Sequence, residues 1–134
     1  MAGFVERYAD SMAKHDSILC VGIDPALPDQ RRDRVIPKHF LHVGGLDDAE
    51  ARLAFSHHLL SNASKYASAA KPNSQYFFGL SPKEHAGLAR AIHDHGLVSI
   101  YDCKLADIGD SIESRMYWMR KCGYDAITVS AQFG

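Results

Sequence analysis

Residues 97–108 carry the sequence LVSIYDCKLADI, and this stretch decides the fold class. It begins as an apolar run of the kind found in buried parallel strands, and it becomes charged at Asp102 and Lys104. Charges are costly inside a sheet that is buried on both faces, but the carboxyl ends of parallel strands open onto binding sites. The stretch therefore predicts a parallel α/β fold with a functional centre at the end of this strand.

The same pattern occurs in three other places along the chain. Residues 17–24 and 68–73 are apolar runs that end near Asp24 and Lys71, and residues 125–130 form another such run. Three of the four predicted strands thus end in ionisable side chains of both signs. Because the carboxyl ends of parallel strands form the site in α/β folds, we expect these side chains to gather at one edge of the sheet.

Helical signals separate the four predicted strands. The expected helices begin near Phe4, at Asp47, at the capping box Ser81-Pro82-Lys83-Glu84 and near Asp110. The last of them is predicted to end at Lys121, with Gly123 at the position that follows the helix cap. Residues 25–46 are predicted to form a long loop. Strands that alternate with helices in this way indicate parallel βα units.

Two architectures fit this alternation, a doubly wound sheet and half of a (β/α)8 barrel. A whole barrel takes about 250 residues, and this chain has 134. The fourth predicted strand is followed by no helix, which indicates truncation. We therefore expect a single domain, residues 1–134, that covers about the first four βα units of a (β/α)8 TIM barrel.

Composition and charge exclude several classes of partner. The formal net charge is −1, with 23% charged and 46% hydrophobic residues, so no electrostatic argument favours nucleic acid or an anionic membrane. No apolar run approaches the roughly 20 residues that span a bilayer, and the first residues do not resemble a secretory signal. The cysteines Cys20, Cys103 and Cys122 are few and far apart, which favours reduced thiols in the cytosol.

The spacing of the charged residues after the third strand points to proton-transfer chemistry. Asp102 and Lys104 are two residues apart, so their side chains are expected on the same side of the strand. Asp107 follows on the loop, close enough to return toward Lys104. A lysine held between carboxylates stays protonated and can deliver a proton to a carbanion. Carboxylates in this position also repel an anionic substrate group, which suits the expulsion of a carboxylate as carbon dioxide.

Several stretches of the sequence resemble a known protein family. The motif Asp-x-Lys-x-x-Asp-Ile at residues 102–108 resembles the signature of the orotidine monophosphate decarboxylase superfamily. Residues 19–25, 71–73 and 125–129 resemble the first, second and fourth strands of the decarboxylases themselves. The long loop after the first strand resembles their larger bacterial-type subgroup. The resemblance implies a cytoplasmic enzyme of pyrimidine synthesis that converts orotidine 5′-monophosphate to uridine 5′-monophosphate.

The resemblance also implies a role for each matched residue. Asp24 would bind the ribose hydroxyls, and Lys71 would contact the ribose and extend the charge network. Asp102 would lie beside the substrate carboxyl group, and Lys104 would protonate C6 of the pyrimidine.

Three further residues are expected to act across a homodimer. The resemblance implies that Asp107 and Ile108 cross the interface into the partner's site. Ser111 falls where the family often has a threonine that is also donated across the dimer. The implied ligand is a pyrimidine nucleotide, and neither a metal ion nor an organic cofactor is implied.

Two alternatives remain open. The chain could be a non-catalytic half-barrel that assembles with itself or with a partner. It could also be a magnesium-dependent sugar-phosphate lyase of the same superfamily, although such enzymes usually have glutamate where this chain has Lys71. The resemblance places the phosphate-gripping loop in the second half of the barrel. We therefore expect little or no decarboxylase activity from these 134 residues alone.

The remaining conspicuous residues are predicted to be structural. The eight histidines show no metal-binding spacing and are expected on the solvated surface. Cys103 is expected to be a small core residue, and the basic cluster at residues 31–34 is expected to be a solvated loop. The methionines and aromatic residues at 116–119 are expected to pack in the core or in an interface.

Overall fold

The computed structural model describes residues 3–41 and 47–131 of the chain. Its centre is one sheet of four parallel strands in sequence order: β1 (Cys20–Ile23), β2 (Ala69–Pro72), β3 (Val98–Leu105) and β4 (Ala126–Val129). This arrangement confirms the predicted parallel α/β fold.

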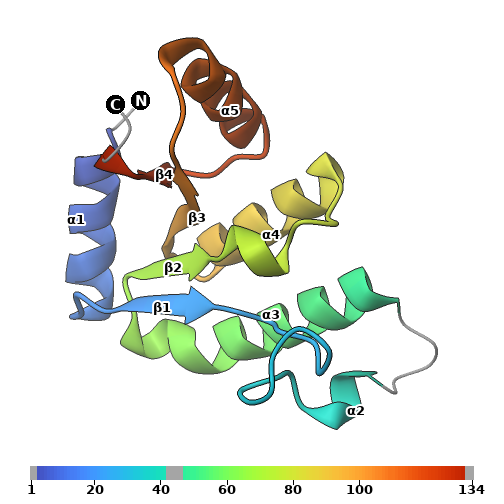
Figure 1. Ribbon diagram of the computed structural model, residues 1–134. Coiled ribbons are helices and arrows are strands. Elements are labelled where there is room, and N and C mark those ends of the chain that lie inside the picture. Colours follow the sequence, from blue (N-terminus) through green and yellow to red (C-terminus); the bar gives the residue numbers. More distant parts are fainter. Residues whose placement is uncertain (1–2, 42–46, 132–134) are drawn as a thin grey trace.

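The helices connect the strands and cover the sheet (Figure 1). They are α1 (Phe4–His15), α2 (Lys38–Leu41), α3 (Asp48–Ala63), α4 (Pro82–Asp94) and α5 (Gly109–Lys121), with short 3-10 turns at η1 (Ser64–Tyr66) and η2 (Ser74–Tyr76). Each of the helices α3, α4 and α5 follows one strand and leads to the next, as in successive βα units. Among the described residues, no helix is both long enough and apolar enough to cross a membrane.

Local sequence signals set the helix ends as predicted. Asp47 caps α3 by accepting a hydrogen bond from the backbone N–H of Glu50 at 2.8 Å, and Ser81 caps α4 in a capping box with Glu84. Gly123 follows the cap of α5 with a φ of +87°, the left-handed conformation that glycine adopts without strain.

Two apolar clusters hold the helices against the sheet. The larger packs α3 and α4 against β1 and β2 and consists of Ile23, Leu60, Ala67, Ala70, Phe77, Leu80, Leu88, Ile92 and Leu97. The smaller lies under α5 and consists of Ala89, Tyr101, Met119, Cys122 and Tyr124. Cys103 is half-buried and packs against this second cluster, as predicted. Because strand residues alternate between faces, the residues of β3 on either side of Tyr101 and Cys103 point to the opposite face of the sheet.

The helix α1 closes the amino-terminal ends of the strands (Figure 1). The hydroxyl of Ser11 lies 2.7 Å from the backbone oxygen of Ser68, which directly precedes β2, and 2.9 Å from that of Gly96, which lies shortly before β3. Arg7 forms an ion pair with Asp125, just before β4, at 2.9 Å. This end of the sheet is therefore covered, and the carboxyl ends of the strands lie at the other end.

Several structural predictions were wrong in detail. The expected loop at residues 25–46 contains the short helix α2, and its residues 42–46 lie outside the described part of the chain. His85 is not a surface residue: it is buried, and its Nδ1 lies 3.1 Å from the hydroxyl of Tyr124. Of the residues at 116–119, which were expected in the core or in an interface, Met119 is buried in the core, whereas Tyr117 and Trp118 are about half exposed, so for these two only the interface remains as a prediction.

Candidate functional site

The site is built around a buried carboxylate at the carboxyl end of β3. Asp102 is 4% exposed, and its two oxygens accept hydrogen bonds from two lysines. The ammonium group of Lys71, in β2, donates to Oδ2, and that of Lys104 donates to Oδ1 at 2.9 Å. The structure therefore brings together Lys71, Asp102 and Lys104, as the sequence predicted for strands that open at one edge.

A fourth member of this cluster was missed by the sequence analysis. The hydroxyl of Thr128, in β4, donates to Oδ1 of Asp102 at 2.8 Å and accepts the backbone N–H of Lys104 at 2.8 Å. The available signal was its place near the end of the fourth strand, two residues after Ala126, on the same face as the other site residues. A threonine in a strand is too common for that signal to be specific.

The backbone of Lys104 adopts an unusual conformation that serves this arrangement. Its φ is +45°, in the left-handed region that residues with a side chain seldom occupy. The pairing of β3 with β4 also shifts in register between Tyr101 and Leu105. The backbone N–H of Lys104 is thereby directed at Thr128 while its side chain stays beside Asp102. Such strained positions concentrate at functional sites because the surrounding structure must stabilise them.

The charges in the cluster stabilise one another. Burial by itself would raise the pKa of Asp102, but the hydrogen bonds from the two lysines and from Thr128 outweigh it and lower the pKa to about 2. The hydrogen bond to Asp102 raises the pKa of Lys71, against the lowering effect of partial burial. The site thus holds an ionised carboxylate and a protonated Lys71 at neutral pH.

Asp24 lies close to this cluster without joining it directly. It follows the last residue of β1, and its negative charge adds to the rise in the pKa of Lys71. Asn73, which follows β2, forms a bridge to Asp102 and donates its backbone N–H to the oxygen of Ile23 at 3.1 Å. The ends of β1, β2 and β3 are therefore tied together at the site.

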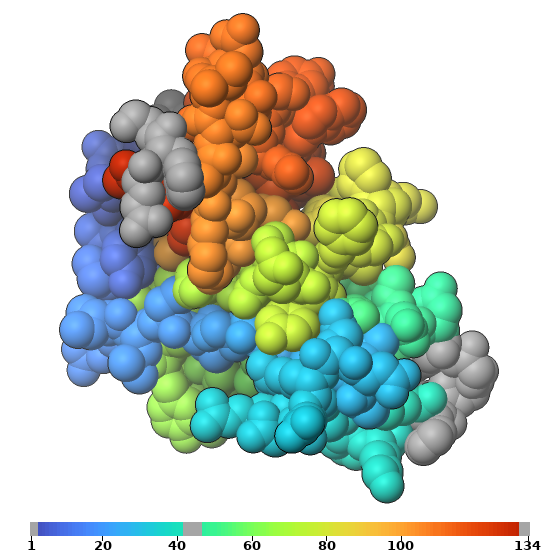
Figure 2. Space-filling view, viewed as in Figure 1, coloured from blue at the N-terminus to red at the C-terminus, as the bar shows by residue number. Residues whose placement is uncertain are grey.

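The three residues expected to act across a dimer lie apart from this cluster. Asp107 and Ile108 belong to the segment between β3 and α5, which protrudes from the molecule (Figure 2). Asp107 accepts the backbone N–H of Ile108 at 2.8 Å, and within the described residues no ion pair joins it to Lys104. Ile108 is 73% exposed. Ser111 and Asp107 line a surface cavity of about 400 Å³ together with Trp118.

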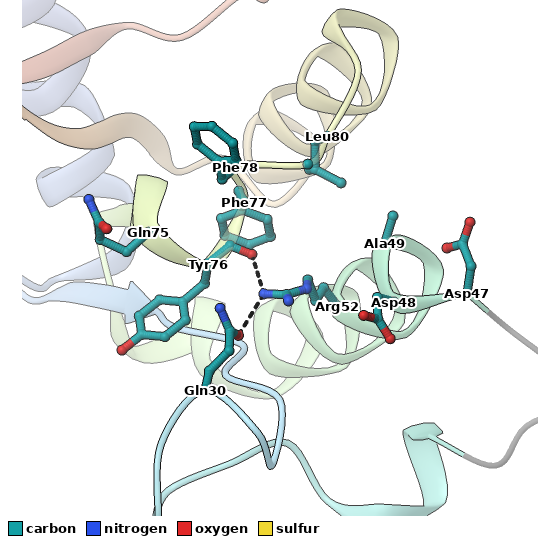
Figure 3. Close-up of a pocket in the computed structure, with 11 residues that line it drawn as sticks. Gln30, Asp47, Asp48, Ala49, Arg52, Gln75, Tyr76, Phe77, Phe78 and Leu80 are labelled. Carbon is teal, nitrogen blue, oxygen red and sulfur yellow. Dashed lines mark hydrogen bonds between the residues drawn. The ribbon is translucent and has the colours of Figure 1, made fainter.

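A large cavity lies beside the site rather than in it. It measures about 710 Å³ and is lined by residues of the loop after β1, of α3 and of the segment after β2 (Figure 3). Arg52 crosses this cavity toward Gln30 and Tyr76. For metal binding, the ranges 3–41 and 47–131 contain no group of three or more His, Cys, Asp or Glu residues placed to hold an ion.

Comparisons with known proteins identify relatives of this chain. No family model matches it. Over 98% of its length it is 30% identical to the orotidine 5′-phosphate decarboxylase of Cupriavidus necator and 28% identical to that of Halobacterium salinarum. It covers 46% and 45% of those proteins, so the chain spans about half the length of the curated relatives it matches.

Solved structures show the same relationship in three dimensions. OMP decarboxylase of Leishmania donovani superposes with a TM-score of 0.69 at 25% identity, over 96% of this chain and 44% of that one. The fold of UMP synthase from Leishmania donovani also matches, with a TM-score of 0.73 at 24% identity, over 100% of this chain and 26% of that one. The chain is therefore homologous, along nearly its whole length, to about half of an orotidine 5′-phosphate decarboxylase.

Proposed function

We propose that this chain supplies the proton-donating half of an active site that decarboxylates orotidine 5′-monophosphate to uridine 5′-monophosphate in pyrimidine synthesis. The observation that carries the proposal is the buried Asp102 carboxylate with Lys71 and Lys104 on its two oxygens. The names of the relatives give the reaction, and the cluster gives it a chemical basis in this chain. Such an enzyme would act in the cytoplasm without a cofactor.

The chemistry follows from charges that are fixed before the substrate arrives. The carboxylate of Asp102 is fixed in place by its contacts with the two lysines and Thr128. It would therefore repel a substrate carboxylate placed next to it. Loss of carbon dioxide removes this repulsion and leaves a carbanion. Lys104 is 65% exposed in its side chain and can reach such a carbanion to donate its proton. The reaction is accelerated because these charges stabilise the transition state more than the bound substrate.

Lys71 and Asp24 would hold the sugar of the nucleotide. Both lie at the rim formed by the ends of β1 and β2, and the charge of Asp24 acts on Lys71. A carboxylate and an ammonium side by side present both an acceptor and donors to a pair of hydroxyl groups. The ammonium of Lys71 also disfavours the magnesium-dependent alternative, because it occupies the place of an anionic metal ligand.

A second copy of the chain would contribute residues to the site. The exposed side chain of Ile108 and the protruding Asp107, which has no ion pair with Lys104 among the described residues, support a role outside their own subunit. Ser111 lies in the same surface region and would contribute its hydroxyl there. In the alternative of a non-catalytic half-barrel, the same surface would assemble without any dependence on nucleotide.

Nucleotide binding tests the proposal. Titration of the 134-residue chain with uridine 5′-monophosphate, followed by calorimetry, should show binding that Lys104→Ala and Asp102→Ala weaken by about tenfold or more. The exposed Lys83→Ala in α4 is the matched control and should bind as the unaltered chain does. An oligomer that ignores the nucleotide would support the non-catalytic alternative instead. Turnover of orotidine 5′-monophosphate by this chain alone should stay far below that of the full-length relatives.

A further inference from the structure

Tyr76 is held by two arginines that come from different elements. Nη1 of Arg52, in α3, donates to the backbone oxygen of Tyr76 at 2.6 Å and to Oε1 of Gln30 at 2.9 Å (Figure 3). Nη1 of Arg31 donates to the Tyr76 hydroxyl at 3.1 Å, and its guanidinium carbon lies 5.3 Å from the centre of the Tyr76 ring. These four residues, here called the arginine clamp, join the loop after β1 to the segment after β2.

The arginine clamp contacts a loop that is held together by hydrogen bonds of its own. Oε1 of Gln30 also accepts the backbone N–H of Leu27 at 3.0 Å, so one side chain serves both the loop and Arg52. The backbone N–H of Ile36 donates to the oxygen of Ala26 at 2.9 Å, and both residues are buried. The loop after β1 packs against the segment after β2 on the surface of the molecule (Figure 2). Because these hydrogen bonds connect the residues of the loop, a contact at Gln30 also restrains the first residues of the loop.

Short backbone connections lead from the clamp to the site. The backbone N–H of Tyr76 donates to the oxygen of Asn73 at 3.0 Å, and Asn73 bridges Ile23 and Asp102. On the other side of the clamp, the backbone N–H of Ala26 donates to the oxygen of Asp24 at 2.8 Å. Each loop therefore meets the clamp within a few residues of a charged side chain of the site.

We infer that Arg52 is a positioning residue, which fixes the spacing between Asp24 and Lys71 by holding the loop after β1 against Tyr76. This inference rests on the proposed nucleotide site and adds to it a cause for its geometry. Arg52 lines the large cavity and lies outside the Asp102 cluster. It would act only through the backbone that it holds, and displacements of about 1 Å in a site can cost up to about a hundredfold in function.

The test compares variants that break or keep the contacts of Arg52. Arg52→Met removes the cation and Gln30→Leu removes its acceptor, whereas Gln30→Glu keeps an oxygen in the same place. We expect the first two to weaken the binding of uridine 5′-monophosphate, by about tenfold for Arg52→Met, and Gln30→Glu to bind it as the unaltered chain does. The double variant Arg52→Met/Gln30→Leu should lose less affinity than the two single losses combined, because the contact between Arg52 and Gln30 is removed by either change, while Gln30→Leu also removes the acceptor of the Leu27 N–H.

Amide hydrogen exchange, followed residue by residue by NMR, gives a readout that does not need the nucleotide. In Arg52→Met and Gln30→Leu, the amides of Ala26, Ile36 and Asn73 should exchange faster. The amide of Val98, which donates to Ser68 at the far end of the sheet, should keep its rate. Arg90→Met, an exposed arginine in α4, is the matched control and should change neither exchange nor affinity.

The outcomes separate the clamp from the proposed function. Faster local exchange together with weaker binding supports the positioning role. Faster local exchange with unchanged affinity overturns the positioning role, because the contact would then serve stability alone. Exchange that rises evenly along the whole chain also overturns it. If the unaltered chain binds no nucleotide, the proposed function fails, and the three local exchange rates alone decide whether the clamp holds the strand ends. If Arg52→Met does not fold, the pair Gln30→Leu and Gln30→Glu carries the same test.

Discussion

Asp102 is the residue on which the polar groups of the site converge. Removing its side chain would leave two ammonium groups close together without the charge that holds them. Thr128, which contacts Asp102, has a different role. Its hydroxyl donates to the Asp102 carboxylate and accepts a hydrogen bond from the backbone N–H of Lys104. Thr128 therefore links the charge of Asp102 to the left-handed backbone of Lys104.

Substitution of Thr128 separates these two contacts from simple packing. Thr128→Val keeps the shape of the side chain but removes the hydroxyl, so the pKa of Asp102 should rise from about 2 toward its ordinary value. The free energy of unfolding should fall by about 1–3 kcal/mol. Thr128→Ser keeps the hydroxyl and should leave the pKa low. A carboxyl-carbon NMR titration measures it, and equal values for the Val and Ser variants would contradict the assigned role.

The charged residues of the site were predictable because their signal is local. Asp102 and Lys104 are two positions apart at the end of an apolar run, and strand geometry alone puts them on one side. Lys71 became predictable once parallel strands were expected to open at one edge. Thr128 could not be found in this way, because its role depends on partners 24 and 26 residues earlier in the chain.

At the scale of elements, strong periodic signals were sufficient and weak ones were not. The helix α4 begins at the predicted Ser81-Pro82 cap, and each of the four strands lies within its predicted range to about one residue. The helix α2 has only four residues and carried no usable signal. The basic cluster at 31–34 was expected to be solvated, and Arg32 and Arg34 are exposed, but Arg31 is half-buried and contacts Tyr76, which lies 45 residues later. Sequence separation of this size hides such contacts.

The attachment of α1 to the sheet depends on one carboxylate. Asp125 forms an ion pair with Arg7 of α1 at 2.9 Å and contacts Nε2 of His93, near the end of α4, at 2.8 Å. It also accepts hydrogen bonds from the backbone N–H and the hydroxyl of Ser99 in β3. Burial by itself would raise the pKa of Asp125, but the hydrogen bonds from His93 and Ser99 lower it to about 2. The carboxylate thus joins α1, α4 and β3 most strongly while it is ionised, because its charge forms the ion pair with Arg7 and strengthens the hydrogen bonds.

Acid should loosen this attachment. The pKa of Asp125 is lower in the folded chain than in the unfolded one, so its ionised form stabilises the fold above about pH 4 and this contribution is lost as the pH falls to about 2. Asp125→Asn should therefore remove about 2 kcal/mol of the pH dependence of the unfolding free energy. Urea unfolding between pH 5 and about pH 2, followed by circular dichroism, measures this dependence.

An exposed carboxylate supplies the control for that experiment. Asp29→Asn removes one negative charge from the loop after β1 without touching α1 or the sheet. If both variants showed the same pH dependence of stability, the contribution would come from net charge rather than from the contacts of Asp125.

At the scale of the whole molecule, the covered and uncovered regions of the sheet have different uses. Helix α1 covers the amino-terminal ends of the strands, and α3, α4 and α5 are packed through the two apolar clusters. The strands β1 and β4 are the edges of the sheet, and edges offer unpaired backbone groups to another chain. Exposed apolar side chains lie at several places on the surface, and those after β3 and along α5 include Ile108 and Trp118, which are 73% and 53% exposed.

This surface predicts how the chain associates. If Ile108 enters a second subunit, burying its side chain should contribute about 1.5–3 kcal/mol to association per copy, and Ile108→Lys should convert a dimer into a monomer. Sedimentation equilibrium measures the mass directly against the 14.8 kDa of one chain. Ile18→Lys is the matched control, because Ile18 is 78% exposed but precedes β1 at the opposite end of the sheet. A dimer broken equally by both variants would place the contact elsewhere, and an unaltered chain that sediments as a monomer would remove the basis for carrying Asp107 into a partner's site.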